Sequence, residues 1–181
     1  MSEHLPDPRR IDLRSFARLR ASIEGSLGQA DLPRLRETLL PTPAAEPVVH
    51  WSARGESRPV KGADAQVWLH LEARMSATLQ CQRCLQPLSA GLTVERSFLF
   101  VEGQAQASQL DEEIDEDVLV LSRAFDVMEL LEDELILALP LVPRHDICPD
   151  PLPTQAADDF DEPRPHPFAA LAALRKPPRV S

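Results

Sequence analysis

Residues 66–81 read QVWLHLEARMSATLQC, and this stretch determines the expected fold. Its odd positions, from Val67 to Cys81, are all apolar, whereas its even positions, from Gln66 to Gln80, are mainly polar. A strict period of two is typical of a β-strand that buries one face against a core, and we expect one long strand over residues 65–81. Because strands rarely exceed about ten residues, we expect this strand to bend or to contain a bulge.

Weaker strand patterns flank this stretch. Residues 48–54 precede it, residues 90–101 follow it, and a short apolar strand is expected at 118–121. The connections between the first three strands are too short for the crossover that parallel neighbours need. We therefore predict an antiparallel meander, in which residues 81–87 form the turn between the second and third strands.

Three segments have helical patterns. Residues 12–24 approximate the helical period, with apolar side chains on one face. Residues 31–40 are predicted to form a short helix with Asp31 as its cap. Asp126 and Glu129 have the spacing of a capping box, which predicts that a further helix begins there.

The sequence therefore predicts one α+β domain over residues 11–148. Its antiparallel β-meander, or partly closed sheet, carries an N-terminal helix and has a C-terminal helix packed on it. We expect a flexible N-terminus at 1–10 and a mobile acidic loop at 103–117. A disordered Pro/Asp-rich tail should form the linker 149–165, and a short C-terminal docking helix should follow at 166–176.

The length and the cysteine content limit the cellular context. A chain of 181 residues suits a single domain. The sequence has no apolar run near the roughly 20 residues that span a bilayer, and its polar N-terminus lacks the apolar core of a signal peptide. We expect a cytoplasmic protein without a membrane partner. An odd count of 3 cysteines argues against a disulfide framework.

All three cysteines fall into two short clusters. Cys81 and Cys84 have CxxC spacing, and His145 and Cys148 have HxxC spacing. Together they have the composition of a Cys3His zinc site, which would be structural because four protein ligands leave no open coordination position. The alternative is three buried or idle thiols and a surface histidine, since Cys81 is in phase with the apolar face of its strand.

The N-terminal third is rich in arginine although the whole chain has a net charge of −10. A uniformly acidic protein would be repelled by nucleic acid, because binding there depends on neutralising phosphates. The arginines form a candidate RNA-binding set, with a solvated helix face as the alternative. The set comprises Arg9, Arg10, Arg14, Arg18, Arg20, Arg34 and Arg36.

The second half of the chain is acidic and ends in an apolar segment. Acids crowd what we expect to be the exposed side of the helix that begins near Asp126. These acids and the apolar residues near the C-terminus are candidates for contacting a protein partner, with a solvated surface and an intramolecular contact as the alternatives. The candidates are Glu129, Glu132, Asp133, Glu134, Phe168, Leu171 and Leu174.

No catalytic motif accompanies these charged segments. The sequence has no phosphate-binding loop, no dinucleotide fingerprint and no nucleophile elbow. We therefore expect neither an enzyme nor a small-molecule substrate, and no cofactor other than structural zinc.

Three blocks of the sequence resemble the signature blocks of a known family. They are LQCQRCL at 79–85, LEDELILALPLVPRH at 131–145 and PFAALAALR at 167–175. In this order they resemble the bacterial YceD family, which is called the large ribosomal RNA subunit accumulation protein.

The resemblance implies a non-enzymatic factor in ribosome biogenesis that acts in the synthesis, processing or stability of 23S rRNA. The implied partners are 23S rRNA or its precursor, and a basic protein of the large ribosomal subunit. An alternative function is a protein-interaction module that chaperones such a protein without contacting RNA.

Overall fold

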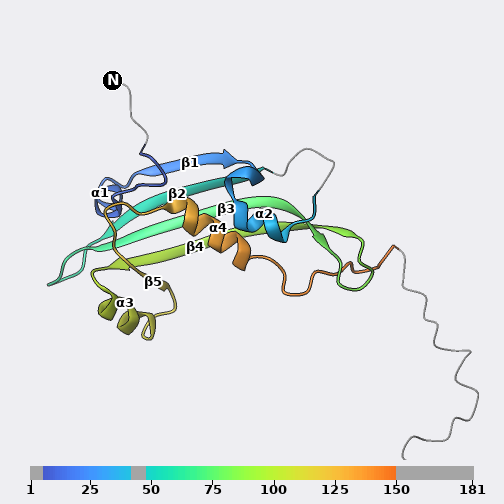
Figure 1. The fold of residues 1–181 in the computed structure, drawn as a ribbon. Helices are drawn as coiled ribbons and strands as arrows, with labels where there is room; N and C mark the ends of the chain where they lie inside the picture. The colour runs from blue at the N-terminus through green and yellow to red at the C-terminus, as the bar shows by residue number, and fades with distance from the viewer. Residues whose placement is uncertain (1–5, 42–47, 150–181) are drawn as a thin grey trace, which may run out of the picture. The chain divides into compact units, whose positions relative to one another are not determined.

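A computed structural model describes residues 6–41 and 48–149 of the chain (Figure 1). Within these ranges the strands form one five-stranded sheet in the order β1-β2-β3-β4-β5. The strands are β1 (Ser22–Leu27), β2 (Val49–Arg58), β3 (Gln66–Gln80), β4 (Pro87–Val101) and β5 (Asp117–Val120). The helices are α1 (Leu13–Arg18), α2 (Pro33–Thr38), α3 (Gln104–Asp111) and α4 (Val127–Leu137), with a 3-10 turn η1 (Gln29–Asp31) before α2.

β3 is the central strand, as its alternating sequence predicts. Leu69 and Leu71 on its apolar face are fully buried. Of the two predicted alternatives, a bend or a bulge, the structure has no bulge, because both ladders of β3 keep a constant register. The ladder with β4 runs without interruption from Val67 opposite Phe100 to Gln80 opposite Pro87. Neighbours on both sides satisfy the main chain of β3 over most of its length, so the strand curves gradually instead (Figure 1).

The predicted helix at 12–24 is wrong in its second half. Helix α1 ends at Arg18, and Arg20 has a φ of 50°, which turns the chain back toward the sheet. The chain then enters β1, where Ile23 is buried and pairs with Ala53 of β2. Only one side chain of β1 is fully buried, so its partner strand determines its conformation more than its own pattern does.

The sheet is mixed and open, because β5 runs parallel to β4. The predicted mobile loop at 103–117 is wrong in its first half, where α3 forms the crossover between these two strands. Ala107 of α3 packs with Trp68 and Leu99 on the second face of the sheet. The predicted α+β class is confirmed, whereas the meander covers only the first four strands.

Three helices cover the apolar face of the sheet. Leu131 and Leu135 of α4 and Leu35 of α2 are almost completely buried there. The predicted cap of α4 is confirmed, since Asp126 accepts hydrogen bonds from the N–H groups of Met128 (2.8 Å) and Glu129 (3.1 Å). These two bonds satisfy N–H groups of the first helical turn that have no acceptor within the helix.

Two expectations at the N-terminal side need correction. Asp31 does not cap α2, because its carboxylate accepts from the N–H of Gly28 at 3.1 Å within the turn η1. Part of the predicted flexible segment 1–10 is fixed, because the carbonyl of Pro8 accepts from the N–H of Val127 at 2.8 Å.

Within the described ranges, no helix has the length and apolar character needed to cross a membrane. The predicted linker and docking helix at 150–176 lie outside the described residues.

Candidate metal centre

The structure brings the four predicted metal ligands together. Cys81 and Cys84 lie on the turn between β3 and β4, and His145 and Cys148 lie on the segment that follows α4 (Figure 1). Their ligand atoms all lie within 4.8 Å of one another, and the three cysteines are buried. The two half-motifs of the sequence therefore form one site, although more than sixty residues separate them along the chain.

A tight turn places the first two thiols. The N–H of Cys81 donates to the carbonyl of Gln86 at 2.9 Å, and the N–H of Leu85 donates to the carbonyl of Cys81 at 2.9 Å. Leu85 has a φ of 61°, which L-residues other than glycine and asparagine rarely adopt. The left-handed conformation of Leu85 reverses the chain direction just after Cys84, so that β4 can begin at Pro87.

The second half of the site is attached to this turn by the main chain. The N–H of Gln82 donates to the carbonyl of Pro143 at 2.8 Å, and the N–H of His145 points to the sulfur of Cys81 at 3.5 Å. The ring of His145 is oriented by the carbonyl of Pro87, 3.1 Å from Nε2. A backbone partner on one ring nitrogen leaves the other, Nδ1, as the metal ligand.

The spacing of the ligand atoms fits a tetrahedral zinc ion. Zinc–sulfur bonds of about 2.3 Å place two sulfurs about 3.8 Å apart, and a sulfur and a nitrogen about 3.6 Å apart. The sulfurs of Cys81 and Cys148 are 4.0 Å apart, and the sulfur of Cys84 is 3.4 Å from Nδ1 of His145. Four protein ligands would fill the coordination sphere of a tetrahedral zinc ion, so a zinc bound here would have no open position for a substrate.

Hydrogen bonds prepare one sulfur for a cation. Burial favours the neutral thiol of Cys81, but the backbone N–H groups of Cys84, His145 and Arg83 outweigh it and lower the pKa of Cys81 to about 5. Burial raises the pKa of Cys148 to about 11, helped by its thiol neighbours. One sulfur is thus a thiolate at neutral pH, which is the form that binds zinc.

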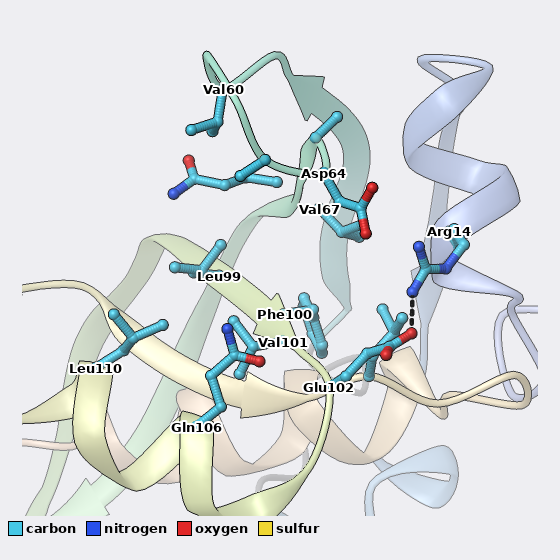
Figure 2. Close-up of a pocket in the computed structure, with 14 residues that line it drawn as sticks. Arg14, Val60, Asp64, Val67, Leu99, Phe100, Val101, Glu102, Gln106 and Leu110 are labelled. Carbon is cyan, nitrogen blue, oxygen red and sulfur yellow. Dashed lines mark hydrogen bonds and ion pairs between the residues drawn. The ribbon is translucent and has the colours of Figure 1, made fainter.

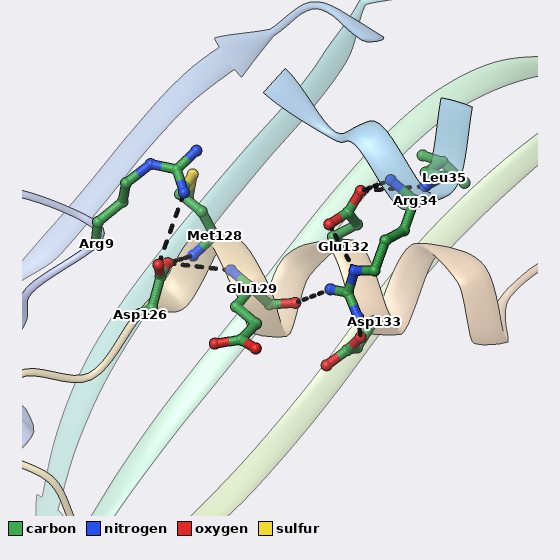
Figure 3. Close-up of polar contacts among 8 residues, drawn as sticks. All are labelled: Arg9, Arg34, Leu35, Asp126, Met128, Glu129, Glu132 and Asp133. Carbon is green, nitrogen blue, oxygen red and sulfur yellow. Dashed lines mark hydrogen bonds and ion pairs between the residues drawn. The ribbon is translucent and has the colours of Figure 1, made fainter. Parts of the chain in front are cut away.

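The seven predicted RNA-binding arginines lie in two kinds of environment. Arg9 lies 3.7 Å from Asp126, and Arg14 pairs with Glu102 at 2.5 Å (Figures 2 and 3). Arg34 is held by Glu132 and Asp133. The other four are exposed and form no ion pair with the described residues; they are Arg10, Arg18, Arg20 and Arg36.

The Arg14–Glu102 pair borders a pocket of about 260 Å³ (Figure 2). Val67, Leu99 and Leu110 contribute apolar surface to it, from β3, β4 and α3. No motif in the sequence indicates this pocket, because its wall includes α3, which the sequence does not predict.

The predicted acidic surface of α4 needs a correction. Glu132 and Glu134 are only 6% and 9% exposed, so they do not lie on the solvent side of the helix. Glu132 instead accepts hydrogen bonds from the N–H groups of Arg34 (2.7 Å) and Leu35 (3.1 Å) at the start of α2 (Figure 3). Among the described candidates for a protein contact, Glu129 is exposed and Asp133 is half-exposed. The candidates Phe168, Leu171 and Leu174 lie outside the described residues.

Comparison with known proteins identifies the family. A profile described as "Large ribosomal RNA subunit accumulation protein YceD" matches residues 69–175, which include most of β3, all of β4 and α4, and all four candidate ligands. A relative of that name from Haemophilus influenzae is 34% identical over 110 residues, which are 58% of this chain and 63% of the relative. The matched part of the chain thus spans less than two thirds of that relative. No solved structure matches the chain. By the extent of the profile match, the chain belongs to the YceD family.

Proposed function

We propose that this protein acts in the accumulation of large-subunit ribosomal RNA, as a non-enzymatic factor in the synthesis, processing or stability of 23S rRNA. The profile match over residues 69–175 carries the proposal, because it includes most of β3, all of β4, β5 and α4, and the four candidate metal ligands. The names of the family and of the Haemophilus relative refer to accumulation of the large ribosomal RNA subunit, which supports the broader part of the proposal.

The metal centre has a structural part in the proposal. Zinc held by Cys81, Cys84, His145 and Cys148 would join the β3–β4 turn to the segment after α4. A bound zinc ion supplies folding free energy here and no reaction step, because its ligands leave no position for substrate. Protein purified under reducing conditions without chelator should contain about one zinc per chain. Less than about half an equivalent would reject the site.

The four unpaired arginines are the best-placed groups for RNA. Arg18 is the last residue of α1 and Arg20 lies two residues beyond it, and both are exposed. Arg9, Arg14 and Arg34 already neutralise carboxylates of the chain, so they have less charge to offer a phosphate. Replacing Arg18 and Arg20 together by Gln should weaken RNA binding and flatten its dependence on salt by roughly one counterion per arginine.

A second candidate function is a chaperone for a basic ribosomal protein that does not itself contact RNA. The acids of residues 111–117 and the overall net charge of −10 favour it. The two candidates differ in what purified protein does alone. A salt-dependent shift of 23S rRNA fragments by the purified chain supports direct binding, whereas a shift seen only with a ribosomal protein supports the chaperone.

The decisive experiment is crosslinking in cells followed by sequencing of the bound RNA. We expect enrichment of 23S rRNA or its precursor over 16S rRNA, either directly or through a bound ribosomal protein. A strain without the protein should accumulate less 23S rRNA relative to 16S rRNA, and the wild-type chain should restore the ratio. An unchanged ratio together with no enrichment would reject the proposed function.

A further inference from the structure

The outer edge of β4 is open over much of its length. β5 pairs only with residues 98–101, so the segment 87–97 has no strand beside it among the described residues (Figure 1). The carbonyl of Val101 accepts from the N–H of Leu121, which places the main-chain groups of odd residues of β4 on this edge. By strand alternation, the odd residues from Ser89 to Glu95 also present an N–H and a C=O outward.

The pairing on the opposite side agrees with this assignment. In the same sheet the N–H of Cys81 bonds to the carbonyl of Gln86, so even residues of β4 bond to β3. The open edge is also regular, because the β3–β4 ladder has a constant register and contains no bulge. Residues 88–95 read LSAGLTVE, which contains no proline, no lysine and no bulge. Natural proteins usually protect a free edge with one of these features or cover it.

A groove lies beside this edge. Its volume is about 420 Å³, and its walls are residues 93–96 of β4 and residues 134, 137 and 138 at the end of α4. Leu137, the last residue of α4, is 74% exposed. A strand added to β4 directs every second side chain toward α4, so Leu137 offers an apolar contact to it.

Negative charge lies on both sides of this edge. Glu134 lines the groove, and its one basic residue, Arg96, is already bound by Asp117 and Glu134. Glu95 also borders the groove, but by strand alternation its side chain points to the opposite face of the sheet from Arg96. Glu95 is exposed and has no ion pair among the described residues. Such an edge favours a segment with lysine or arginine over one with acidic side chains.

We propose that the outer edge of β4 at residues 89–95 binds an extended basic segment of another protein as an added strand. Main-chain hydrogen bonds would supply the affinity. Glu95 would favour basic side chains of the added strand, and Leu137 would favour apolar side chains at the alternate positions. The site does not depend on the proposed role in ribosomal RNA accumulation. Either proposal can fail in its own experiment while the other stands.

The probe is a ten-residue peptide of alternating lysine and valine, blocked at both ends, added to the full-length chain. A peptide of alternating glutamate and valine is the control. We expect binding of the lysine peptide to slow amide hydrogen exchange at Gly91, Thr93 and Glu95, and the glutamate peptide to bind at least about tenfold more weakly. Equal binding of the two peptides, or no change in exchange on β4, would overturn the proposal.

Two variants test the edge and the charge separately. Thr93→Pro removes an outward N–H and should weaken binding about tenfold, whereas Thr93→Val keeps the N–H and should bind like the wild type. Glu95→Lys should reverse the preference and favour the glutamate peptide. If Thr93→Pro does not fold, Glu95→Lys still tests the proposal, because an unchanged preference for the lysine peptide would contradict it.

A second copy of the chain is the main competing occupant, since two β4 edges can pair with each other. We expect the free chain to be a monomer with unprotected amides at Gly91, Thr93 and Glu95. A dimer that Thr93→Pro dissociates would assign the edge to self-association and overturn the proposal. Protection of these amides in a free monomer would also overturn it, because the chain itself would then cover the edge.

Discussion

Replacing Glu132 should separate α2 from α4 at a large cost in stability. The side chain of Glu132 is 8% exposed and accepts three hydrogen bonds, from the N–H groups of Arg34 and Leu35 and from Nε of Arg34. It therefore acts as the N-terminal cap of α2, although it belongs to another helix. Its negative charge also lies at the positive end of the α2 dipole.

The magnitude follows from the groups that lose a partner. Glu132→Ala leaves two main-chain donors without an acceptor, and a lost hydrogen bond to a charged group costs about 1.5–3 kcal/mol. The Arg34 side chain is 49% exposed, so water replaces much of its bond to Glu132 and we give that bond little weight. For two such bonds we expect Glu132→Ala to lower the free energy of unfolding by about 3–6 kcal/mol. Glu132→Gln should cost less, because the amide oxygen still accepts.

Asp133 provides the matched control. It contacts the same Arg34 at 2.6 Å, but its side chain is 47% exposed and caps no helix. Exposed ion pairs contribute about 0–1 kcal/mol, so Asp133→Ala should change stability by no more than that. Urea unfolding followed by circular dichroism measures both variants. If Glu132→Ala is no more destabilising than Asp133→Ala, Glu132 is not the cap of α2.

Three further predictions concern single positions. Arg58 and then His70 lower the pKa of Glu56 to about 2 from an ordinary 4.5, so its contribution to stability is present above pH 4.5 and disappears as the pH falls toward 2. Glu56→Gln should therefore flatten the acid side of a plot of unfolding free energy against pH, and an unchanged curve would contradict this role of Glu56. A Cβ at Gly55 would lie 2.8 Å from the carbonyl oxygen of Phe16, so Gly55→Ala should cost about 1–3 kcal/mol, whereas Gly91→Ala, with no atom within 4 Å, should be neutral in the same urea assay. Leu85 has a φ of 61° and is 59% exposed, so Leu85→Asn should raise the thermal midpoint by relieving up to about 1 kcal/mol of strain. If Leu85→Asn instead lowers the unfolding free energy by more than about 1 kcal/mol, the Leu85 side chain stabilises the turn and backbone strain does not decide the effect.

The central strand was predictable because its burial repeats at every second residue. β3 extends over 66–80, close to the predicted 65–81. Helix α4 was predictable from Asp126, since a cap residue acts within the next three residues of its own chain. Both signals are local, so the sequence contains all the information they need.

The missed elements depend on partners that are distant in sequence. β1 buries only Ile23 fully, and α3 buries only Ala107, so neither has a repeating pattern that indicates its type. The function of Glu132 depends on Arg34 and Leu35 of α2, which lie 98 and 97 residues earlier in the chain. An acid in an amphipathic helix is ordinarily solvated, and no local feature distinguishes the one that caps another helix.

The metal centre lies between these cases. The residue types and the short CxxC and HxxC spacings indicated ligands, but the sequence left open whether the two pairs meet. Their meeting depends on α4 packing across the sheet, which directs the following segment to the β3–β4 turn (Figure 1). The hydrogen bond from Gln82 to Pro143 then fixes the approach of the two segments.

Removal of zinc should open this region locally and leave the sheet folded. The segment after α4 buries little apolar surface, since Leu141, Val142 and Ile147 are 101%, 55% and 88% exposed. Without that burial, the proposed zinc ion and a few hydrogen bonds to the β3–β4 turn are what hold the segment in place. The sheet core keeps its own burial, because Leu69 and Leu71 are fully buried without contribution from the segment. After chelation we expect faster amide hydrogen exchange at 82–86 and 144–148, unchanged exchange in the middle of β3, and the same pattern in Cys84→Ser without chelator. Uniformly faster exchange would mean that zinc supports the whole domain, and unchanged exchange would mean that the four ligands hold no metal.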